Sequence, residues 1–414
     1  MIIQANKYEG HLTAPGSKSH AQRLLLLAAL SKESSTIQNF DNSADNLSTL
    51  AALRQLNHKL RLEGTQVLVE PLPYKNAQID IQIGESGFGL RTLAFVGHCF
   101  ASSYSINGVG SLLTRTHWAT INTLEALGLE IQHNDGKLPL QISGSIQNFR
   151  LSVDGSSGSQ HVSGLFMLAS QINGSWEITV EHLKSAPYFY WTLATLRQAG
   201  FVYELKERTY FFEGAQELHL KNATIEGDWS SVAAHLVGAA ISGSIHVSGL
   251  LADSLQADRG LLRILCAFGA EIKWENGVLT VTQAKEANGF QTDINDHPDL
   301  FPVLVILACA AIGVSRIQGI QRLQNKESDR LAAMCAALEA WKIQYEIKDD
   351  QITIWGKGKL PFAELNSYND HRIAMAICMA SLLSKNGQAI NEMHCLKKSY
   401  PGFYEDFLAL SKGE

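Results

Sequence analysis

A pattern that recurs about every 70 residues constrains this chain more than any other feature. Each copy begins with a short turn rich in Gly, Ser, Asp or Asn, and the turn leads into an apolar helix with many small residues. The copies begin at Gly16, Gly84, Gly155, Gly227, Pro298 and Tyr368. Even spacing of this kind is typical of duplicated structural units. We therefore expect six similar units.

The residues after each apolar helix predict the rest of the unit. The stretches LATLRQAGFVY and LLRILCAFGAEI space their apolar residues as a helix does, and each has a glycine suited to a helix end. Short stretches such as VLTVTQ and QITIWG alternate as strands do. Each unit is thus predicted to run strand, helix, strand, helix, strand, strand, which gives an α/β fold. The first helix is apolar nearly all round and belongs in a core.

Composition excludes several classes of function. The net charge of -6 disfavours binding to a nucleic acid backbone. The longest apolar run, residues 302–314, is too short to cross a bilayer, and the N-terminus lacks the apolar segment of a secretory signal. The six cysteines form no CxxC pair and no cluster with histidine, so we expect no metal site. These features indicate a cytoplasmic protein.

Cations stand where local rules disfavour them. A helix N-terminus already carries positive charge, so Lys and Arg usually avoid it. Here such positions hold Lys18, Arg23, Arg91, His371 and Arg372. Violations of local preference are candidates for function, because a bound anion would reverse the penalty. A solvated surface cation is the alternative for each, but a weak one for Arg23 and Arg372, because apolar residues follow them. It is a stronger alternative for Arg91, which an internal ion pair could also explain.

Two of these positions suggest a carboxylate site. Ser19 and Arg23 are four residues apart and share a helical face. A hydroxyl beside a guanidinium can hold a carboxylate.

The segment QNKESDRLAAM gathers charges at another helix start. Asp329 is suited to cap the helix. Lys326, Glu327 and Arg330 together resemble a site, although a solvated charge cluster would look alike. Asp299, before another buried run, either caps a helix or is placed to take a proton.

The motifs GSKSxxxR, VDGSxxSQ, KESDR, YNDHRxAM and a final Lys-Ser-Tyr-Pro resemble, in order and spacing, those of the 5-enolpyruvylshikimate-3-phosphate synthase family. The resemblance covers the full chain. It implies an inverse α/β barrel-like fold of two similar domains, each with three βαβαββ units, that close over substrate. One domain would comprise residues 14–226, and the other residues 1–13 and 227–414.

The resemblance also implies a reaction. The enolpyruvyl group of phosphoenolpyruvate would be transferred to the 5-hydroxyl of shikimate 3-phosphate, with release of phosphate, in the synthesis of chorismate and the aromatic amino acids. This chemistry requires no metal, nucleotide or covalent nucleophile, so we expect no cofactor. The expected partners are the two small substrates, with neither nucleic acid nor membrane, and we expect a monomer.

Residue roles follow from the matching motifs. The resemblance assigns shikimate 3-phosphate to Ser19, Arg23, Ser159, Gln160, Ser185, Tyr188, Asp299 and Lys326. It assigns phosphoenolpyruvate to Lys18, Gly87, Arg115, Gln160, Arg330, Arg372 and Lys398. Asp299 would be the base for the 5-hydroxyl, with Lys326 beside it, and Glu327 would donate a proton. A closed, dry site would favour the protonated form that Glu327 needs.

Several positions depart from the family pattern. The family usually has Asn-Ala/Ser-Gly-Thr where this chain has Glu85-Ser86-Gly87-Phe88. Glu85 brings negative charge toward an anion, and Phe88 replaces a small hydroxyl residue. These two changes bear on phosphoenolpyruvate affinity and on the response to its mimic glyphosate, although Arg91 could offset Glu85 by pairing with it.

Two further positions also differ from common family members. Gly158 replaces a common serine, and Arg322 stands where some members have asparagine.

Three alternatives remain at this point. The related transferase that acts on UDP-N-acetylglucosamine relies on a loop cysteine near the region of Arg115, and this chain has none there. A non-catalytic or altered-specificity relative that binds phosphorylated ligands is motivated by Glu85 and Phe88. An RNA-end cyclase with related domains is disfavoured by the acidic charge.

Overall fold

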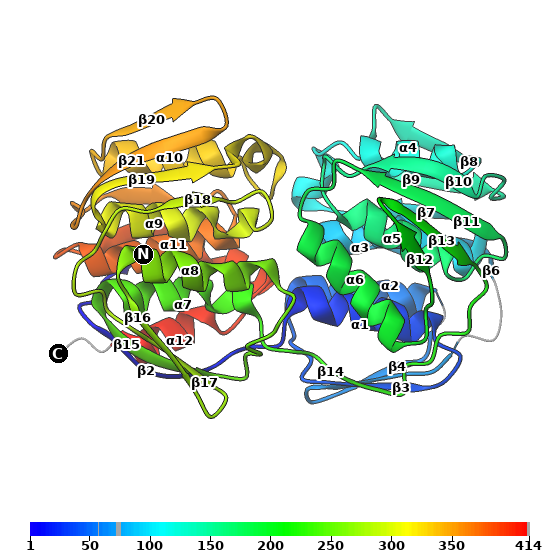
Figure 1. Ribbon diagram of the computed structural model, residues 1–414, viewed down its shortest axis with the longest axis horizontal. Helices are drawn as coiled ribbons and strands as arrows, with labels where there is room; N and C mark the ends of the chain where they lie inside the picture. The colour runs from blue at the N-terminus through cyan, green and yellow to red at the C-terminus, as the bar shows by residue number, and fades with distance from the viewer. Residues whose placement is uncertain (57, 72–75, 412–414) are drawn as a thin grey trace. The chain divides into compact units, whose positions relative to one another are not determined.

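The computed structural model describes residues 1–56, 58–71 and 76–411, and Figure 1 shows the course of the chain. The chain divides into two compact units. We call Gly16–Ile225 the inserted unit, and Met1–Pro15 together with Glu226–Glu414 the terminal unit.

The inserted unit contains three four-stranded sheets of one design, with the orders β14-β3-β5-β4, β6-β7-β9-β8 and β10-β11-β13-β12. In each sheet the first two strands are parallel and the remaining pairs are antiparallel. The strands are β3 (Ser35–Gln38), β4 (Leu60–Glu63), β5 (Gln66–Val69), β6 (Asn76–Gln82), β7 (Ala101–Asn107), β8 (Leu129–Asn134), β9 (Lys137–Gly144), β10 (Arg150–Asp154), β11 (Ser175–Glu181), β12 (Glu204–Lys206), β13 (Thr209–Glu213) and β14 (Asn222–Thr224). The helices are α1 (Lys18–Leu30), α2 (Ala44–Gln55), α3 (Gly87–Val96), α4 (Trp118–Ala126), α5 (Gln160–Ala169) and α6 (Ala186–Gln198).

The terminal unit repeats the design in sheets of order β2-β15-β17-β16 and β18-β19-β21-β20, and adds a three-stranded sheet of order β1-β23-β22. Its strands are β1 (Ile2–Ile3), β2 (Tyr8–Thr13), β15 (Gly243–Ser248), β16 (Glu271–Glu275), β17 (Val278–Thr282), β18 (Gln291–Asp293), β19 (Ile312–Gln318), β20 (Tyr345–Lys348), β21 (Gln351–Lys357), β22 (Glu364–Asn366) and β23 (Gln388–Asn391). Its helices are α7 (Trp229–Ser242), α8 (Leu261–Phe268), α9 (Phe301–Ala310), α10 (Arg330–Ala340), α11 (His371–Ala380) and α12 (Phe403–Leu410).

The element order confirms the predicted repeat. The stretch β6, α3, β7, α4, β8 and β9 reads as one complete βαβαββ unit. Two strands are exchanged between the first and fourth copies of the repeat. The strand β2 precedes α1 of the first copy but pairs with β15 of the fourth, and β14 precedes α7 of the fourth copy but pairs with β3 of the first. The sixth copy is shorter, because β1 pairs antiparallel with β23 where the others have a hairpin.

The first helix of each copy is buried, as its composition predicted. Every residue of α9 and α11 is buried, and α7, α9 and α11 belong to one apolar core, with a second core in the inserted unit. In the inserted unit α3 and α5 approach closely at Gly164, where an added Cβ would lie 2.7 Å from the Phe95 ring. None of the helices in the described residues combines the length and apolar character that a membrane crossing requires.

A neutral histidine is locked in the core of the terminal unit. His235 is fully buried on α7, its Nδ1 lies 2.6 Å from the Tyr8 hydroxyl, and the rings of Tyr400 and Phe403 pack around it. Burial lowers the pKa of His235 from 6.5 to about 3. A protonated imidazole is therefore disfavoured in the folded protein but not in the unfolded chain.

We predict that His235 makes the terminal unit sensitive to acid. Because its folded pKa is depressed, its contribution is complete above pH 6.5 and is lost as the pH falls toward 3. The full contribution is on the order of a few kcal/mol. His235→Gln keeps an acceptor for Tyr8 and should flatten the dependence of unfolding free energy on pH between 6 and 4, by about one proton. Denaturant unfolding at several pH values measures this slope. His394→Gln, at an exposed position, is the control; equal slopes in the two variants would contradict the prediction.

Candidate functional site

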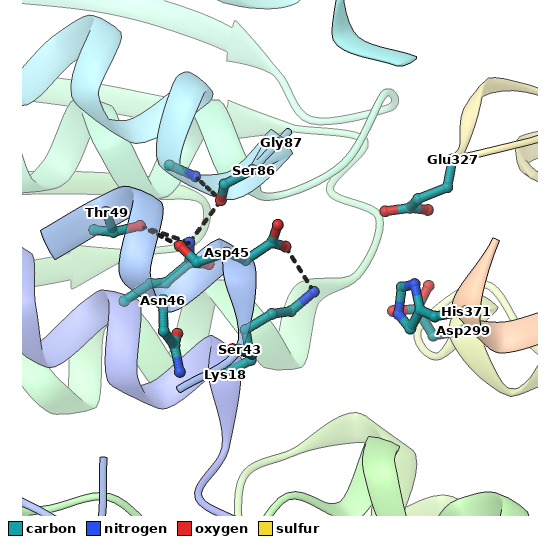
Figure 2. A network of polar contacts seen from close by, with 12 residues as sticks. Lys18, Ser43, Asp45, Asn46, Thr49, Ser86, Gly87, Asp299, Glu327 and His371 are labelled. Atoms are coloured by element: carbon teal, nitrogen blue, oxygen red, sulfur yellow. Dashed lines mark hydrogen bonds and ion pairs between the residues drawn. The ribbon is translucent and has the colours of Figure 1, made fainter. Parts of the chain in front are cut away.

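The helix starts of the inserted unit are tied together by polar side chains. Lys18, the first residue of α1, places its Nζ 3.0 Å from Oδ2 of Asp45, which lies in the first turn of α2 (Figure 2). Asp45 is buried, and the exposed fraction of the Lys18 side chain is 16%. The carboxylate thus offsets a cation at a positive helix end. Sequence reasoning gave Asp45 no role, since an acid in a first turn is an ordinary feature of helices.

Gln22 extends this network to α3. Its Nε2 donates to Thr49 Oγ1 at 2.7 Å and to Ser86 Oγ at 2.6 Å, and Gln22 itself is buried. Ser86 caps α3 by accepting from the amide of Gly89. Side-chain hydrogen bonds therefore join the starts of α1, α2 and α3. Gln22 stands beside Arg23, just before the apolar run, and the sequence alone gave it no role.

Two guanidinium groups lie against the N-terminus of α3. A Cβ added to Gly87 would lie 2.9 Å from Nη1 of Arg91 and 3.6 Å from Nη1 of Arg115. Arg91 Nη1 also donates to Gln160 Oε1 at 2.9 Å, which joins the start of α3 to that of α5. Free amides, a helix dipole and two cations are the elements of an anion site. The structure thus brings together three predicted residues, Gly87, Arg115 and Gln160.

Glu85 is directed to the turn that precedes Arg115. A Cβ added to Gly110 would fall on Glu85 Oε1, so this carboxylate lies against the backbone of the turn Gly110–Leu113. The Glu85 side chain therefore lies next to the segment that leads to Arg115.

Arg23 is covered by aromatic rings. Only 1% of it is exposed, and the ring centroids of Phe88, Trp191 and Tyr188 lie 4.5, 5.2 and 5.8 Å from its Cζ. Its Nε, Nη1 and Nη2 donate to Thr192 Oγ1, the Ser19 carbonyl and the Tyr188 carbonyl, all of which are uncharged acceptors. Burial lowers the pKa of Arg23 to about 9, although Tyr188 acts in the opposite direction.

Phe88, which replaces a small hydroxyl residue of the family motif, packs against Arg23. Its side chain joins the core and faces Arg23, a residue expected on the shikimate side. Such a cation–π contact stabilises the guanidinium charge where water is excluded.

The remaining predicted residues of the inserted unit flank helix starts. Ser159 precedes α5 and Ser185 precedes α6, and both are buried. Tyr188 lies in the first turn of α6 and is half-buried. Gly158 has φ +130, a backbone conformation in which a residue with a side chain would be strained.

In the terminal unit, Arg330 is the centre of a carboxylate cluster. It is the first residue of α10 and is 1% exposed. Its Nη1 lies 2.6 Å from Asp299 Oδ1, its Nη2 2.8 Å from Glu327 Oε2, and its Nε 2.8 Å from Asp370 Oδ2. Burial alone would lower the pKa of Arg330, but Asp370, Asp299 and Glu327 raise it well above its ordinary value. The guanidinium is therefore a permanent cation.

Asp299 is surrounded by cations rather than capping a helix. Besides Arg330, it lies 4.0 Å from Lys326 Nζ and 3.8 Å from Arg372 Nη2. Burial alone would raise the pKa of Asp299, but Arg330, Lys326 and Arg372 together lower it well below its usual range. Its side chain is 35% exposed and can meet a ligand. By contrast, Asp329 caps α10 through the Ala332 amide, as its position predicted.

The cation set around Asp299 includes two residues of the turn before α10. Burial lowers the pKa of Lys326 to about 8, although Asp299 opposes this shift. Burial also lowers the pKa of Arg322, whose Nη1 donates to the Asn295 carbonyl. A bound anion near Lys326 and Arg322 would stabilise the charged forms of both side chains.

Arg372 connects α11 to α7. Its Nη1 donates to the Ser230 carbonyl at 2.6 Å, and its own amide donates to Asp370. In the described part of the chain, no hydrogen-bond partner is in reach of its buried Nε. Lys398 ends the turn Met393–Lys398 and is also buried. No cluster of metal-ligating side chains occurs among the residues that the structure describes.

Comparison with known proteins identifies the family of this chain. The family model for EPSP synthase (3-phosphoshikimate 1-carboxyvinyltransferase) matches residues 2–407. The 3-phosphoshikimate 1-carboxyvinyltransferase of Clostridium kluyveri is 34% identical over 99% of this chain and 96% of its own length.

Solved structures agree. EPSP synthase from Acinetobacter baumannii has a TM-score of 0.81 at 25% identity, covering 99% of this chain and 97% of its own. The enolpyruvyl transferase NikO from Streptomyces tendae, at 15% identity with a TM-score of 0.76, covers 99% of this chain and 96% of its own and shares the fold. The predicted fold class is confirmed, and the chain belongs to the EPSP synthase family, the 3-phosphoshikimate 1-carboxyvinyltransferases.

Proposed function

We propose that the helix-start clusters of the two units divide one reaction between them. The reaction follows from the family: the enolpyruvyl group of phosphoenolpyruvate is transferred to the 5-hydroxyl of shikimate 3-phosphate, and phosphate is released on the route to chorismate and the aromatic amino acids. The family match over residues 2–407 carries this conclusion.

The proposal divides the substrates by charge. Each substrate carries a carboxylate and a phosphate, so preorganised cations can supply much of the stabilisation. We assign residues 14–226 to the shikimate 3-phosphate side, and residues 1–13 with 227–414 to the acid–base chemistry and the carboxylate clamp of phosphoenolpyruvate.

On the shikimate 3-phosphate side, the proposed contacts are Ser19, Arg23, Ser159, Gln160, Ser185 and Tyr188, with Asp299 and Lys326 from the terminal unit. Because Arg23 is almost fully buried, direct contact with the shikimate carboxylate requires a covering side chain to move. Phosphoenolpyruvate is assigned to Lys18, Gly87, Arg115, Gln160, Arg330, Arg372 and Lys398. Paired guanidinium groups suit its carboxylate.

Asp299 and Glu327 supply the proton transfers in this proposal. The 5-hydroxyl oxygen bonds to C2 of phosphoenolpyruvate as its proton passes to Asp299, while the methylene carbon takes a proton from Glu327. The Glu327 carboxylate then takes a proton back from the new methyl group, and the double bond reforms. The carbon–oxygen bond to phosphate breaks as the leaving phosphate takes the proton from Asp299. Lys326 stabilises charge beside the 5-hydroxyl.

Substrate binding prepares both carboxylates. Asp299 and Glu327 each contact Arg330, which stabilises their charged forms. A substrate carboxylate that draws the donors of Arg330 and Arg372 would weaken these contacts. Asp299 would then become a better base, and Glu327 could carry the proton that it donates.

The proposal includes no cofactor, since the chemistry is complete without one. It places the protein in the cytoplasm as a monomer, without nucleic acid or membrane partners.

The direct test is an assay with the purified protein. Mixed with shikimate 3-phosphate and phosphoenolpyruvate in the presence of a chelator and without nucleotide, the protein should release one phosphate for each enolpyruvyl group transferred. Phosphate release and product formation by mass spectrometry measure both. Binding of both substrates without turnover would instead indicate a non-catalytic relative.

Glu327→Gln tests the proposed proton donor. The amide keeps the shape and an acceptor for Arg330 but has no acidic proton, so we expect kcat to fall by roughly a hundredfold or more with small changes in KM. Steady-state kinetics check this, with Glu346→Gln at an exposed site as control. Normal turnover in the Glu327 variant would exclude the acid role.

Lys326 predicts a pH dependence. Because its pKa is about 8, its positive charge is lost as the pH rises through that value, and kcat/KM should fall. Lys326→Arg keeps the charge at high pH, so its alkaline limb should move upward even if its peak rate is lower. Rate profiles from pH 6 to 10 measure the limb, with exposed Lys342→Arg as control. An unmoved limb would assign the titration to another group.

A further inference from the structure

We propose that Asp370 is a positioning residue that holds Arg330 and Arg372 ready for the carboxylate of phosphoenolpyruvate. This inference rests on the proposed function, which assigns that carboxylate to the two arginines. Neither the motif comparison nor the reaction chemistry had given Asp370 a role. Its contacts within the terminal unit lead to it.

Asp370 differs from the other two carboxylates of Arg330. It is fully buried and contacts the guanidinium twice, through Nε at 2.8 Å and Nη2 at 3.4 Å. Asp299 and Glu327 each make one contact and have side chains that are 35% and 19% exposed. An incoming carboxylate can therefore replace Asp299 or Glu327 but cannot reach Asp370. Asp370 is the counter-ion that stays.

The same carboxylate also fixes Arg372. Asp370 is the N-cap of α11, and its Oδ1 accepts from the Arg372 amide at 2.9 Å. The Ser328 hydroxyl donates to its Oδ2 at 3.2 Å, which ties the segment before α10 to the start of α11. One side chain thus sets the positions of both arginines.

The negative charge of Asp370 also decides how easily Arg330 changes partners. With Asp370 present, Arg330 retains a full counter-charge when Asp299 and Glu327 are released. Without it, the buried guanidinium would depend on those two carboxylates alone and would hold them more tightly. The substrate carboxylate would then compete with Asp299 and Glu327 for the donors of Arg330. Loss of the charge should weaken phosphoenolpyruvate binding selectively.

Asp370→Asn tests this, because asparagine caps helices as well as aspartate does but carries no charge. We expect KM for phosphoenolpyruvate to rise between about tenfold and a hundredfold, as for loss of a hydrogen bond between charged groups. KM for shikimate 3-phosphate should change by less than about twofold, and kcat should fall. Asp329→Asn, the same change at the neighbouring cap of α10, is the matched control and should leave both KM values unchanged.

Thermal unfolding of the two variants separates positioning from stability. Similar melting temperatures with a selective rise in KM for phosphoenolpyruvate support the inference. Equal changes in both KM values, or no change in either, would overturn the inference. The proposed function is tested separately by the activity of the wild-type protein, which these outcomes would leave unaffected. If Asp370→Asn fails to fold, Ser328→Ala is the substitute, because it removes one hydrogen bond to Asp370. This variant should cause a smaller rise in KM for phosphoenolpyruvate. An unchanged KM would likewise overturn the inference.

Discussion

The structure of each unit depends on one constraint: the starts of several buried helices are gathered, and each adds positive potential to the same region. Lys and Arg side chains at these helix starts add to the electrostatic repulsion, which destabilises the fold unless each cation has a partner. In the terminal unit, Arg330 is tolerated because Asp299, Glu327 and Asp370 surround it. In the inserted unit, Asp45 forms an ion pair with Lys18, whereas Arg23 donates to uncharged acceptors and packs against aromatic rings. The two units solve the same electrostatic problem with different chemistry.

This difference relates to function. A carboxylate cluster can exchange one anion for another, which fits the acid–base role proposed for the terminal unit. The uncharged acceptors and rings around Arg23 provide no such exchange, which fits the role proposed for the inserted unit in holding shikimate 3-phosphate. The positions of Phe88 and Glu85 fit this view, because Phe88 covers Arg23 and Glu85 lies on the turn before Arg115.

Much of the fold and part of the site could be predicted from the sequence. Periodicity identified the buried helices and the order of the elements, since both are local properties of the chain. Asp299 and Glu327, two of the carboxylates around Arg330, were also singled out, because KESDR and the segment around Asp299 carry charges at expected helix starts. Asp370 was present in a quoted motif yet received no role. Its position at a helix start looked like an ordinary cap, and nothing local indicates that it also faces Arg330.

The sequence by itself determined the repeated unit, the burial of the inner helices and the surplus of cations at their starts. Tertiary structure alone decided which partners those cations have. Lys18 meets Asp45 from 27 residues away, Arg330 meets Asp370 from 40, and Arg23 meets Thr192 from 169. Helical periodicity sets which face a side chain occupies, but the packing of whole helices sets what lies opposite that face. The exchange of β2 and β14 was likewise settled by pairing between distant strands.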